Sequence, residues 1–176
     1  VCRNVWKIFG KSPEQILGTV TDEQSNAHIQ ERTGHVIAVR GVSFAVKRGE
    51  TFVVMGLSGS GKSTLVRCIS RLTEPTAGEV LIDGDDVLKM DDDALRTVRR
   101  TKVAMVFQNF GLFPHRRVID NVAYGLEVQG VSRAQRTARA REVLELVNLS
   151  GWENHYPGQL SGGMQQRVGL ARALAV

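Results

Sequence analysis

One short stretch of this sequence has the residue types and the spacing of a phosphate-binding loop. GLSGSGKST, residues 56–64, satisfies the pattern G-x-x-x-x-G-K-[S/T]. Glycines let backbone N–H groups turn inward around an anion, and Lys62 adds a mobile positive charge for the β- and γ-phosphates. The hydroxyl of Ser63 suits Mg²⁺. The residues expected to bind the nucleotide here are Gly56, Leu57, Ser58, Gly59, Ser60, Gly61, Lys62, Ser63 and Thr64.

Such a loop works only between a strand and a helix, and the flanking residues predict both. Thr51–Met55 is a short apolar run rich in β-branched residues, which is typical of a buried strand. Lys62–Leu72 carries apolar residues at the spacing of one helix face. The alternative, a Gly/Ser-rich turn with a chance lysine, does not explain this context. The chain is therefore predicted to bind a nucleoside triphosphate.

The rest of the chain indicates strands first, then alternation, then helices. A polar insertion covers residues 10–34, with a helix expected around Pro13–Leu17 or Glu23–Glu31. Asp83-Gly84 has the composition of a hairpin turn. Further strands are expected at Val5–Ile8, Val36–Val39, Ser43–Val46, 78–82 and Lys102–Phe107, and helices at Asp91–Arg100 and Ser132–Val147. We expect a sheet-based core followed by a helical subdomain.

Composition bounds the function classes. The 176 residues are 42% hydrophobic and 23% charged, which suits one globular domain. No window approaches 18 consecutive apolar residues, and the first residues do not form a signal peptide. Cys2 and Cys68 are too few for a disulfide framework, so a reducing cytosol fits best. The net charge is +5, and the positive residues fall mainly in Arg96–Lys102 and Arg133–Arg141. Neither stretch is interleaved with aromatic residues that could stack bases, so we expect no nucleic-acid partner.

Two later segments decide which kind of phosphate-loop protein this is. In VFQNFGLFPH, residues 106–115, an expected strand ends at Gln108, whose amide could meet Mg²⁺ or the attacking water. In LSGGMQQRVGLARAL, residues 160–174, small polar residues open onto a helix, which is a second anion-binding start. A plain helix N-cap with flexible glycines is the alternative for this stretch.

Taken in order, the three motifs resemble the nucleotide-binding domain of ATP-binding cassette (ABC) proteins over essentially the whole chain. The resemblance implies an α/β fold: a P-loop NTPase core with an antiparallel β subdomain plus a helical signature subdomain, incomplete at the C-terminus. It also implies one domain over 1–176, with the core at 1–107, the helical subdomain at 108–160 and the signature helix at 161–176. Gln108 matches the Q-loop glutamine, and Leu160–Met164 the signature motif, in which Met164 replaces the more common glutamine.

The resemblance assigns roles to these residues. Two cassettes pair head to tail as a homodimer, and the signature of one closes over ATP held by the P-loop of the other. The signature residues expected to bind nucleotide are Leu160, Ser161, Gly162, Gly163 and Gln165. Catalytic roles fall to Lys62 and Gln108, and Mg²⁺ ligation to Ser63 and Gln108. In the family a base-stacking aromatic falls near Thr33, where this chain has none.

Two family features are expected beyond Val176: a strand ending in Asp and Glu that serve Mg²⁺ and water, and a later switch histidine. We therefore expect the 176 residues alone to bind ATP weakly and to hydrolyse it poorly. His28, His35, His115 and His155 all precede the signature and do not match the switch position.

Within the family the chain resembles the ATPase subunits of glycine betaine/proline betaine (quaternary amine) importers. The 10–34 insertion and the form LSGGMQQRVGLARAL carry this resemblance, with methionine, other amino-acid and polyamine importers as neighbours. It implies a peripheral position at the cytoplasmic face of the inner membrane, against a transmembrane permease subunit. A periplasmic or lipid-anchored substrate-binding protein would be an indirect partner. The alternatives are a ribosome- or DNA-associated ABC ATPase and a catalytically dead nucleotide-binding fragment.

Overall fold

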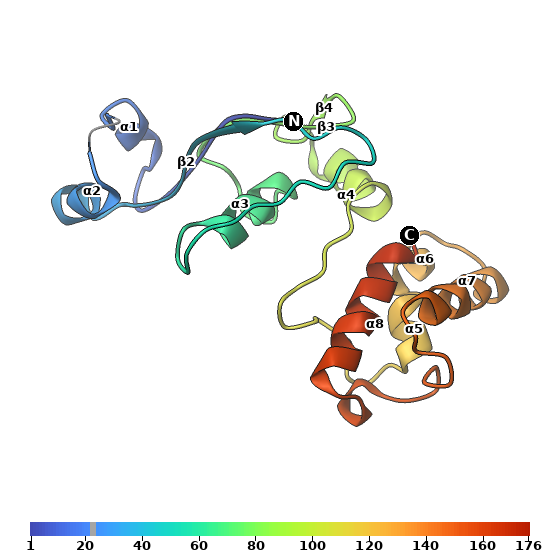
Figure 1. Ribbon diagram of the computed structural model, residues 1–176. Helices are drawn as coiled ribbons and strands as arrows, with labels where there is room; N and C mark the ends of the chain where they lie inside the picture. The colour runs from blue at the N-terminus through green and yellow to red at the C-terminus, as the bar shows by residue number, and fades with distance from the viewer. Residues whose placement is uncertain (22–23) are drawn as a thin grey trace. The chain divides into compact units, whose positions relative to one another are not determined.

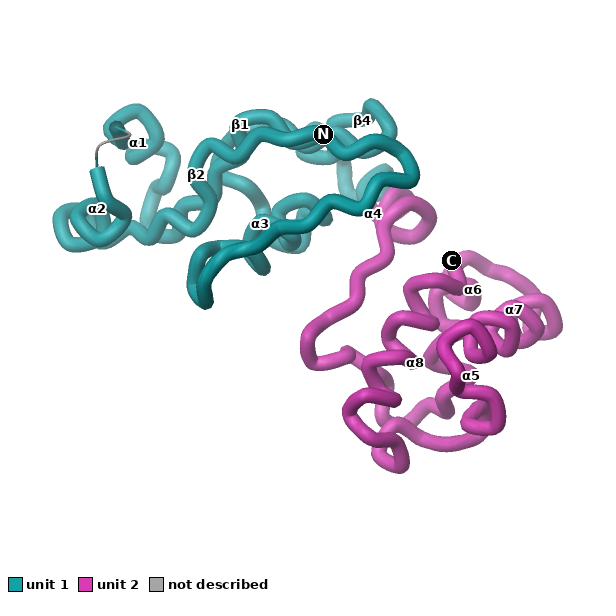
Figure 2. The backbone as a smooth tube through the Cα atoms, in the orientation of Figure 1, with its two compact units in different colours: residues 1–95 teal, residues 96–176 magenta. Residues whose placement is uncertain are grey.

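A computed structural model describes residues 1–21 and 24–176 (Figure 1). The chain divides into two compact units, residues 1–95 and 96–176, which Figure 2 colours separately. The expected helix start at Glu23 lies outside the described residues. No helix in the described ranges combines the length and the apolar character needed to cross a bilayer.

An antiparallel sheet forms the frame of the first unit. Its strands are β1 (Cys2–Phe9), β2 (Val36–Phe44), β3 (Ala77–Ile82) and β4 (Asp85–Asp86), in the spatial order β2-β1-β3-β4. Val5 lies opposite Val42 and Ile8 opposite Ile37, with register shifts between these pairs. The strand buries every third residue instead of every second one, because its pairing with β2 shifts register several times; Asn4, in a left-handed conformation (φ 48°), lies at the first of these shifts. The prediction of strands at Val5–Ile8 and 78–82 is confirmed.

Two predicted strands form one. Val36–Val39 and Ser43–Val46 were expected to be separate, but β2 runs through both as far as Phe44. Gly41 lies inside the strand with a φ of +56°, which lets the ladder to β1 continue through an irregularity in place of a turn.

The polar insertion folds back onto the end of this sheet. It contains α1 (Glu14–Leu17) and α2 (Asn26–Thr33), and Ser25 caps α2 by accepting a hydrogen bond from the His28 N–H. Ile29, fully buried, packs with Ile8 and Ile37 in a small apolar cluster. The insertion is thus anchored to the sheet by its own core.

Two other predicted strands are absent from the fold. Thr51–Met55 and Lys102–Phe107 have no strand assignment, and no described strand pairs with either of them. Phe52, Val53 and Met55 are 46%, 67% and 84% exposed, so the expected burial of the first run is wrong as well. The physical reason is that an apolar run becomes a strand only when neighbouring strands satisfy its N–H and C=O groups.

Helices follow the predicted pattern more closely. In the first unit α3 (Lys62–Ile69) buries Leu65 and Cys68, and α4 (Asp92–Thr101) spans the division between the units. The second unit contains α5 (Val118–Val122), α6 (Tyr124–Val128), α7 (Arg133–Leu146), the 3₁₀ turn η1 (Pro157–Gln159) and α8 (Gly162–Leu174). Both cysteines are free and buried, and burial raises the pKa of each thiol.

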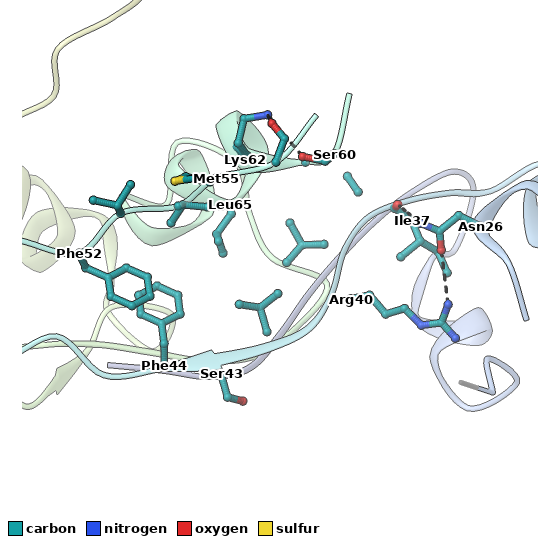
Figure 3. A pocket seen from close by; sticks show the side chains of 17 residues that line it. Asn26, Ile37, Arg40, Ser43, Phe44, Phe52, Met55, Ser60, Lys62 and Leu65 are labelled. Atoms are coloured by element: carbon teal, nitrogen blue, oxygen red, sulfur yellow. Dashed lines mark hydrogen bonds between the residues drawn. The ribbon is translucent and has the colours of Figure 1, made fainter. Parts of the chain in front are cut away.

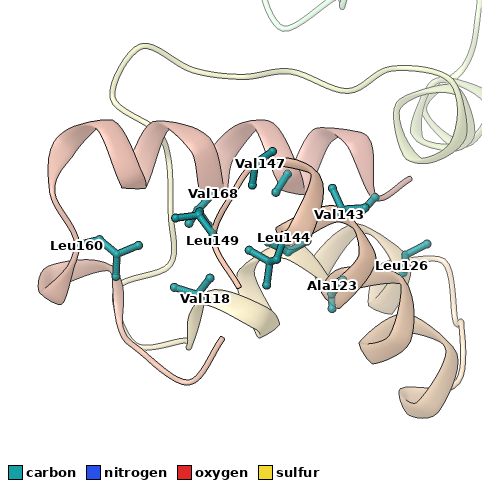
Figure 4. Packing of buried hydrophobic residues seen from close by; sticks show 13 residues of the cluster. Val118, Ala123, Leu126, Val143, Leu144, Val147, Leu149, Leu160 and Val168 are labelled. Carbon is teal, nitrogen blue, oxygen red and sulfur yellow. The ribbon is translucent and has the colours of Figure 1, made fainter. Parts of the chain in front are cut away.

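The second unit has a continuous apolar core, which Figure 4 shows between α5, α7 and α8. Val118, Val143, Leu144 and Val168 are fully buried in it, and Leu160 joins them from the loop before α8. The signature segment therefore begins on a side chain that is fixed in this core. This confirmed mixture of an antiparallel sheet and a helical subdomain is the α/β fold expected from the sequence.

Candidate nucleotide site

The loop at 56–64 wraps around the lysine at its end. Lys62 is the first residue of α3, and its ammonium donates hydrogen bonds to the carbonyl oxygens of Gly56 (2.8 Å) and Leu57 (2.6 Å). A third contact, 3.4 Å, joins it to Ser60 Oγ. The positive charge is thus held over the loop, at the position where a bound phosphate would meet it.

Gly61 fixes the loop against the sheet. Its φ of +87° is left-handed, and a Cβ built on it would lie 1.9 Å from the backbone oxygen of Ala38 in β2. No other residue type fits both the conformation and this close approach. The pattern's second glycine is therefore required by packing as well as by phosphate chemistry.

Electrostatics at the loop favour an anion. Residues 56–60 are exposed, and the first turn of α3 has no acidic residue. The N-terminal amides of a helix carry a partial positive charge, to which Lys62 adds a full one. Ser63 is exposed on the first turn, so its hydroxyl is available to a cation or to a phosphate. The arrangement can hold a polyphosphate with Mg²⁺.

A cavity of about 590 Å³ lies between β2 and the segment that leads into the loop (Figure 3). Gly56, Ser60 and Lys62 line one end, and apolar side chains line most of the remainder. Within it the rings of Phe44 and Phe52 stack in parallel, with centroids 4.6 Å apart. Phe52 is 46% exposed, so part of this stack is accessible from solvent.

The absence of a base-stacking aromatic near Thr33 has a structural counterpart. Thr33 is the last residue of α2, and its hydroxyl donates a hydrogen bond of 2.6 Å to the Ile29 carbonyl. The Thr33 hydroxyl therefore stabilises the C-terminal end of α2.

The Q-loop segment lies in the second unit. Gln108 is exposed in a turn, so its amide is accessible. Phe110 and Gly111 lie shortly after Gln108 in the chain. Their carbonyl oxygens accept hydrogen bonds from Arg172 of α8, at 3.0 Å and 2.7 Å respectively. Burial lowers the pKa of the Arg172 guanidinium. Arg172 thus joins α8 to the segment that follows Gln108.

Ser161 is the N-cap of α8. Its side chain accepts a hydrogen bond from the Met164 N–H at 3.3 Å, and its backbone is extended. Gly162 and Gly163 follow, both exposed, with open space where a Cβ would stand. The helix start therefore presents small residues and unpaired amides, which is the chemistry of an anion site.

The remaining signature residues face inward. The Leu160 side chain is buried in the helical core, so only its backbone could reach a nucleotide. Gln165 donates hydrogen bonds to the carbonyl oxygens of Pro157 (3.1 Å) and Leu160 (3.2 Å), which supports the turn before the helix. Met164 packs against the same core. This contact accounts for an apolar residue at that position.

Two positioning residues escaped the sequence interpretation. One is Arg172, and the other is Asn121, which is fully buried on α5. Asn121 accepts from the Phe113 N–H at 2.7 Å and donates to the carbonyls of Phe113, Arg116 and Arg117. The sequence shows only that an asparagine stands among the residues of an expected helix, and this does not reveal which groups its side chain binds.

Comparison with known proteins agrees with this picture. A family model described as ABC transporter matches residues 39–176. The chain is 55% identical over 170 residues to the glycine betaine transport ATP-binding protein OpuAA of Bacillus subtilis, covering 97% of this chain and 41% of that protein. It is 51% identical over 174 residues to the glycine betaine/proline betaine transport system ATP-binding protein ProV of Escherichia coli, covering 99% and 44%. The chain thus spans less than half the length of these two relatives.

Solved structures give the same answer for the fold. The dimeric structure of MJ0796, a bacterial ABC transporter cassette, is similar with a TM-score of 0.81 and 38% identity, over 99% of this chain and 68% of that one. A dimeric post-hydrolysis state of the same cassette, bound to ADP and Pi, gives a TM-score of 0.80. The family match and the identities together show that the chain belongs to the ABC transporter family.

Proposed function

We propose that this chain is part of an ATP-binding and ATP-hydrolysing subunit that energises an ABC importer for glycine betaine, proline betaine or related quaternary amines. The observation that carries the proposal is the loop at 56–64, which holds the Lys62 ammonium across its own carbonyls at the start of α3. The substrate class draws support from the names of relatives at 51–55% identity.

ATP would bind with its β- and γ-phosphates on the P-loop, Gly56 to Thr64. Its phosphate oxygens would replace the carbonyls of Gly56 and Leu57 as partners of Lys62, and each charge-assisted bond would be worth about 1.5–3 kcal/mol. Mg²⁺ would be held by the exposed hydroxyl of Ser63, because hard cations prefer oxygen ligands, and the family resemblance assigns the side-chain oxygen of Gln108 to it as a second ligand. The bound cation would offset phosphate charge while these residues orient the nucleotide and the water.

The signature helix would complete the site of a second copy. Ser161, Gly162 and Gly163 present a hydroxyl and free amides that suit a γ-phosphate, whereas Leu160 and Gln165 support the turn from behind. We infer a head-to-tail homodimer that binds a transmembrane permease subunit at the cytoplasmic face of the membrane. A substrate-binding protein would act through that permease. The domain would be single over 1–176, with the core at 1–107 and the helical parts at 108–160 and 161–176.

The P-loop assignment is tested by Lys62→Ala. ATP binding by the chain, measured by calorimetry or by a fluorescent ATP analogue, should be abolished. Lys47→Ala removes an equal charge from an exposed position in the same unit and should leave ATP binding unchanged. Equal losses in the two variants, or full binding by Lys62→Ala, would contradict the assignment.

The signature assignment is tested by Ser161→Arg in a complete domain. Binding of ATP should persist, and ATP-dependent dimerisation, measured by light scattering, should be lost. Ser150→Arg adds the same bulk and charge at another exposed serine of the second unit and should dimerise normally. A Ser161→Arg variant that still dimerised with ATP would remove the signature from the interface.

A further inference from the structure

The second unit contains a charged cavity that the proposed ATPase cycle does not use. Its volume is about 320 Å³, and its charged lining consists of Arg116, Arg117, Arg133, Arg136, Asp120 and Glu127. His115 and Tyr156 complete the wall, so every lining residue carries a polar or charged group. It lies within the helical subdomain, on residues outside both the P-loop and the signature.

Positive charge exceeds negative charge in this cavity. Glu127 is shared by two of the arginines, with Arg116 at 3.1 Å and Arg136 at 3.6 Å. Arg117 donates one hydrogen bond, to the Asn154 side chain at 3.2 Å. The Arg133 side chain makes no hydrogen bond or ion pair with any residue in the described ranges. Two guanidinium groups are therefore not neutralised by a carboxylate contact.

The arginines also oppose the local rule for helix ends. Arg133 and Arg136 lie in the first turn of α7, a helix of 14 residues whose first turn has no acidic residue. Basic side chains are unfavourable at a helix N-terminus, because the unpaired amides there already carry positive charge. Sequences break such rules chiefly where function requires it. An anion in the cavity would be attracted by both the arginines and the helix end.

Two of the guanidinium groups are held in place before any ligand arrives. Glu127 receives bonds from Arg116 at 3.1 Å and 3.4 Å, and the Arg116 guanidinium also lies over the rings of Phe113 (5.6 Å) and Tyr124 (5.1 Å). Arg136 donates to the Val131 carbonyl at 3.3 Å. Glu127 thus occupies the fork of Arg116 and fixes this side of the cavity, whereas the guanidinium groups of Arg117 and Arg133 keep the planar geometry with which arginine binds phosphate and have no carboxylate contact within the described residues.

We propose that the cavity lined by Arg116, Arg117, Arg133 and Arg136 is a binding site for a phosphate group, distinct from the P-loop. The group can be free phosphate or a phosphomonoester, or the phosphate of an anionic lipid headgroup. An acidic peptide is the less favoured ligand, because a peptide needs apolar contacts beside its carboxylates and the wall of this cavity contains no aliphatic side chain.

The test uses the whole chain in a Lys62→Ala background, so that the P-loop does not contribute. Inorganic phosphate and a polyglutamate peptide are each titrated by calorimetry, and sedimentation measures binding to vesicles of phosphatidylglycerol with phosphatidylcholine and of phosphatidylcholine alone. The variants are Arg133→Gln and Arg117→Gln. Arg141→Gln is the matched control, since Arg141 lies exposed on the same helix and outside the cavity.

We expect Arg133→Gln and Arg117→Gln each to weaken binding about tenfold or more, and Arg141→Gln to leave it within about twofold. Binding of inorganic phosphate with this pattern identifies a free phosphate as the source. Binding of phosphatidylglycerol vesicles alone with this pattern identifies the lipid headgroup. Equal losses in all three variants, no binding of either probe, or binding only of a polyglutamate peptide would overturn the proposal.

Discussion

Each unit contains a helix start that we propose to bind an anion, and the two helix starts are held in place in different ways. In the second unit Ser161 begins α8 from a loop whose Leu160 is buried in a continuous core of helices close together in sequence. In the first unit Gly61 begins α3 from a loop held by backbone approach to β2, and the preceding run 51–55 is exposed. A helical core closes with local partners, whereas a strand-flanked loop depends on neighbours supplied by the sheet.

The largest effect should come from the helical core. Leu144→Ala removes a fully buried side chain of α7 and should lower the free energy of unfolding of this unit by about 2–5 kcal/mol. Leu146→Ala, two positions along the same helix and 72% exposed, should change it by less than about 0.5 kcal/mol. Urea unfolding followed by Trp152 fluorescence measures both, because Trp152 packs against this core. Similar losses of unfolding free energy in the two variants would mean that Leu144 does not contribute to a packed core.

In the first unit the corresponding test is at the loop glycines. Gly59→Ala and Gly61→Ala both meet a left-handed backbone, which costs about 1–2 kcal/mol. Only Gly61→Ala adds a Cβ at 1.9 Å from the Ala38 oxygen, whereas nothing lies within 4 Å of a Cβ at Gly59. Gly61→Ala should therefore lose more stability in thermal unfolding and should bind ATP less well. If Gly59→Ala were equally damaging, backbone approach to β2 would not be what holds the loop.

The cap of α8 should give an intermediate effect. Ser161→Ala removes the acceptor for the Met164 N–H and should lower the free energy of unfolding by about 1 kcal/mol. Ser161→Asn restores an acceptor and should recover most of the loss. Denaturant titration separates the two variants. A fall in stability that Asn does not recover would show that the serine acts through something other than the cap.

The smallest predicted effect is on the dependence of stability on acidic pH. The hydrogen bond from Arg116 lowers the pKa of the Glu127 carboxyl below its ordinary value of 4.5. A carboxyl with a depressed folded pKa contributes stability above its unfolded pKa and loses it as the pH falls through the folded value. Glu127→Gln should therefore flatten the decline in stability below about pH 4.5, measured by acid titration of circular dichroism. An unchanged acid profile would show that this ion pair is not coupled to folding.

Local signals predicted the elements that depend on local contacts. The helix from Lys62, the helix of α7 and the hairpin turn at Asp83-Gly84 follow from periodicity, capping and turn chemistry within a few residues. The P-loop was recognisable for the same reason, since its glycines and lysine act within nine positions of one another.

Contacts between distant residues were beyond the reach of the sequence. Thr51–Met55 has the composition of a strand, but pairing depends on which segments lie beside it. The continuity of β2 through Gly41 depends on its ladder to β1. Arg172 reads as one more basic residue of a helix, and its partners lie about 60 positions earlier in the chain.

Two hydrogen bonds from Arg172 join α8 to the segment that follows Gln108. The guanidinium spans the carbonyls of Phe110 and Gly111 from a helix that begins at the signature. A displacement of α8 along its axis would therefore either move these two peptide groups with the helix or break both hydrogen bonds. The Arg172 guanidinium thus couples the position of α8 to that of residues 110–111.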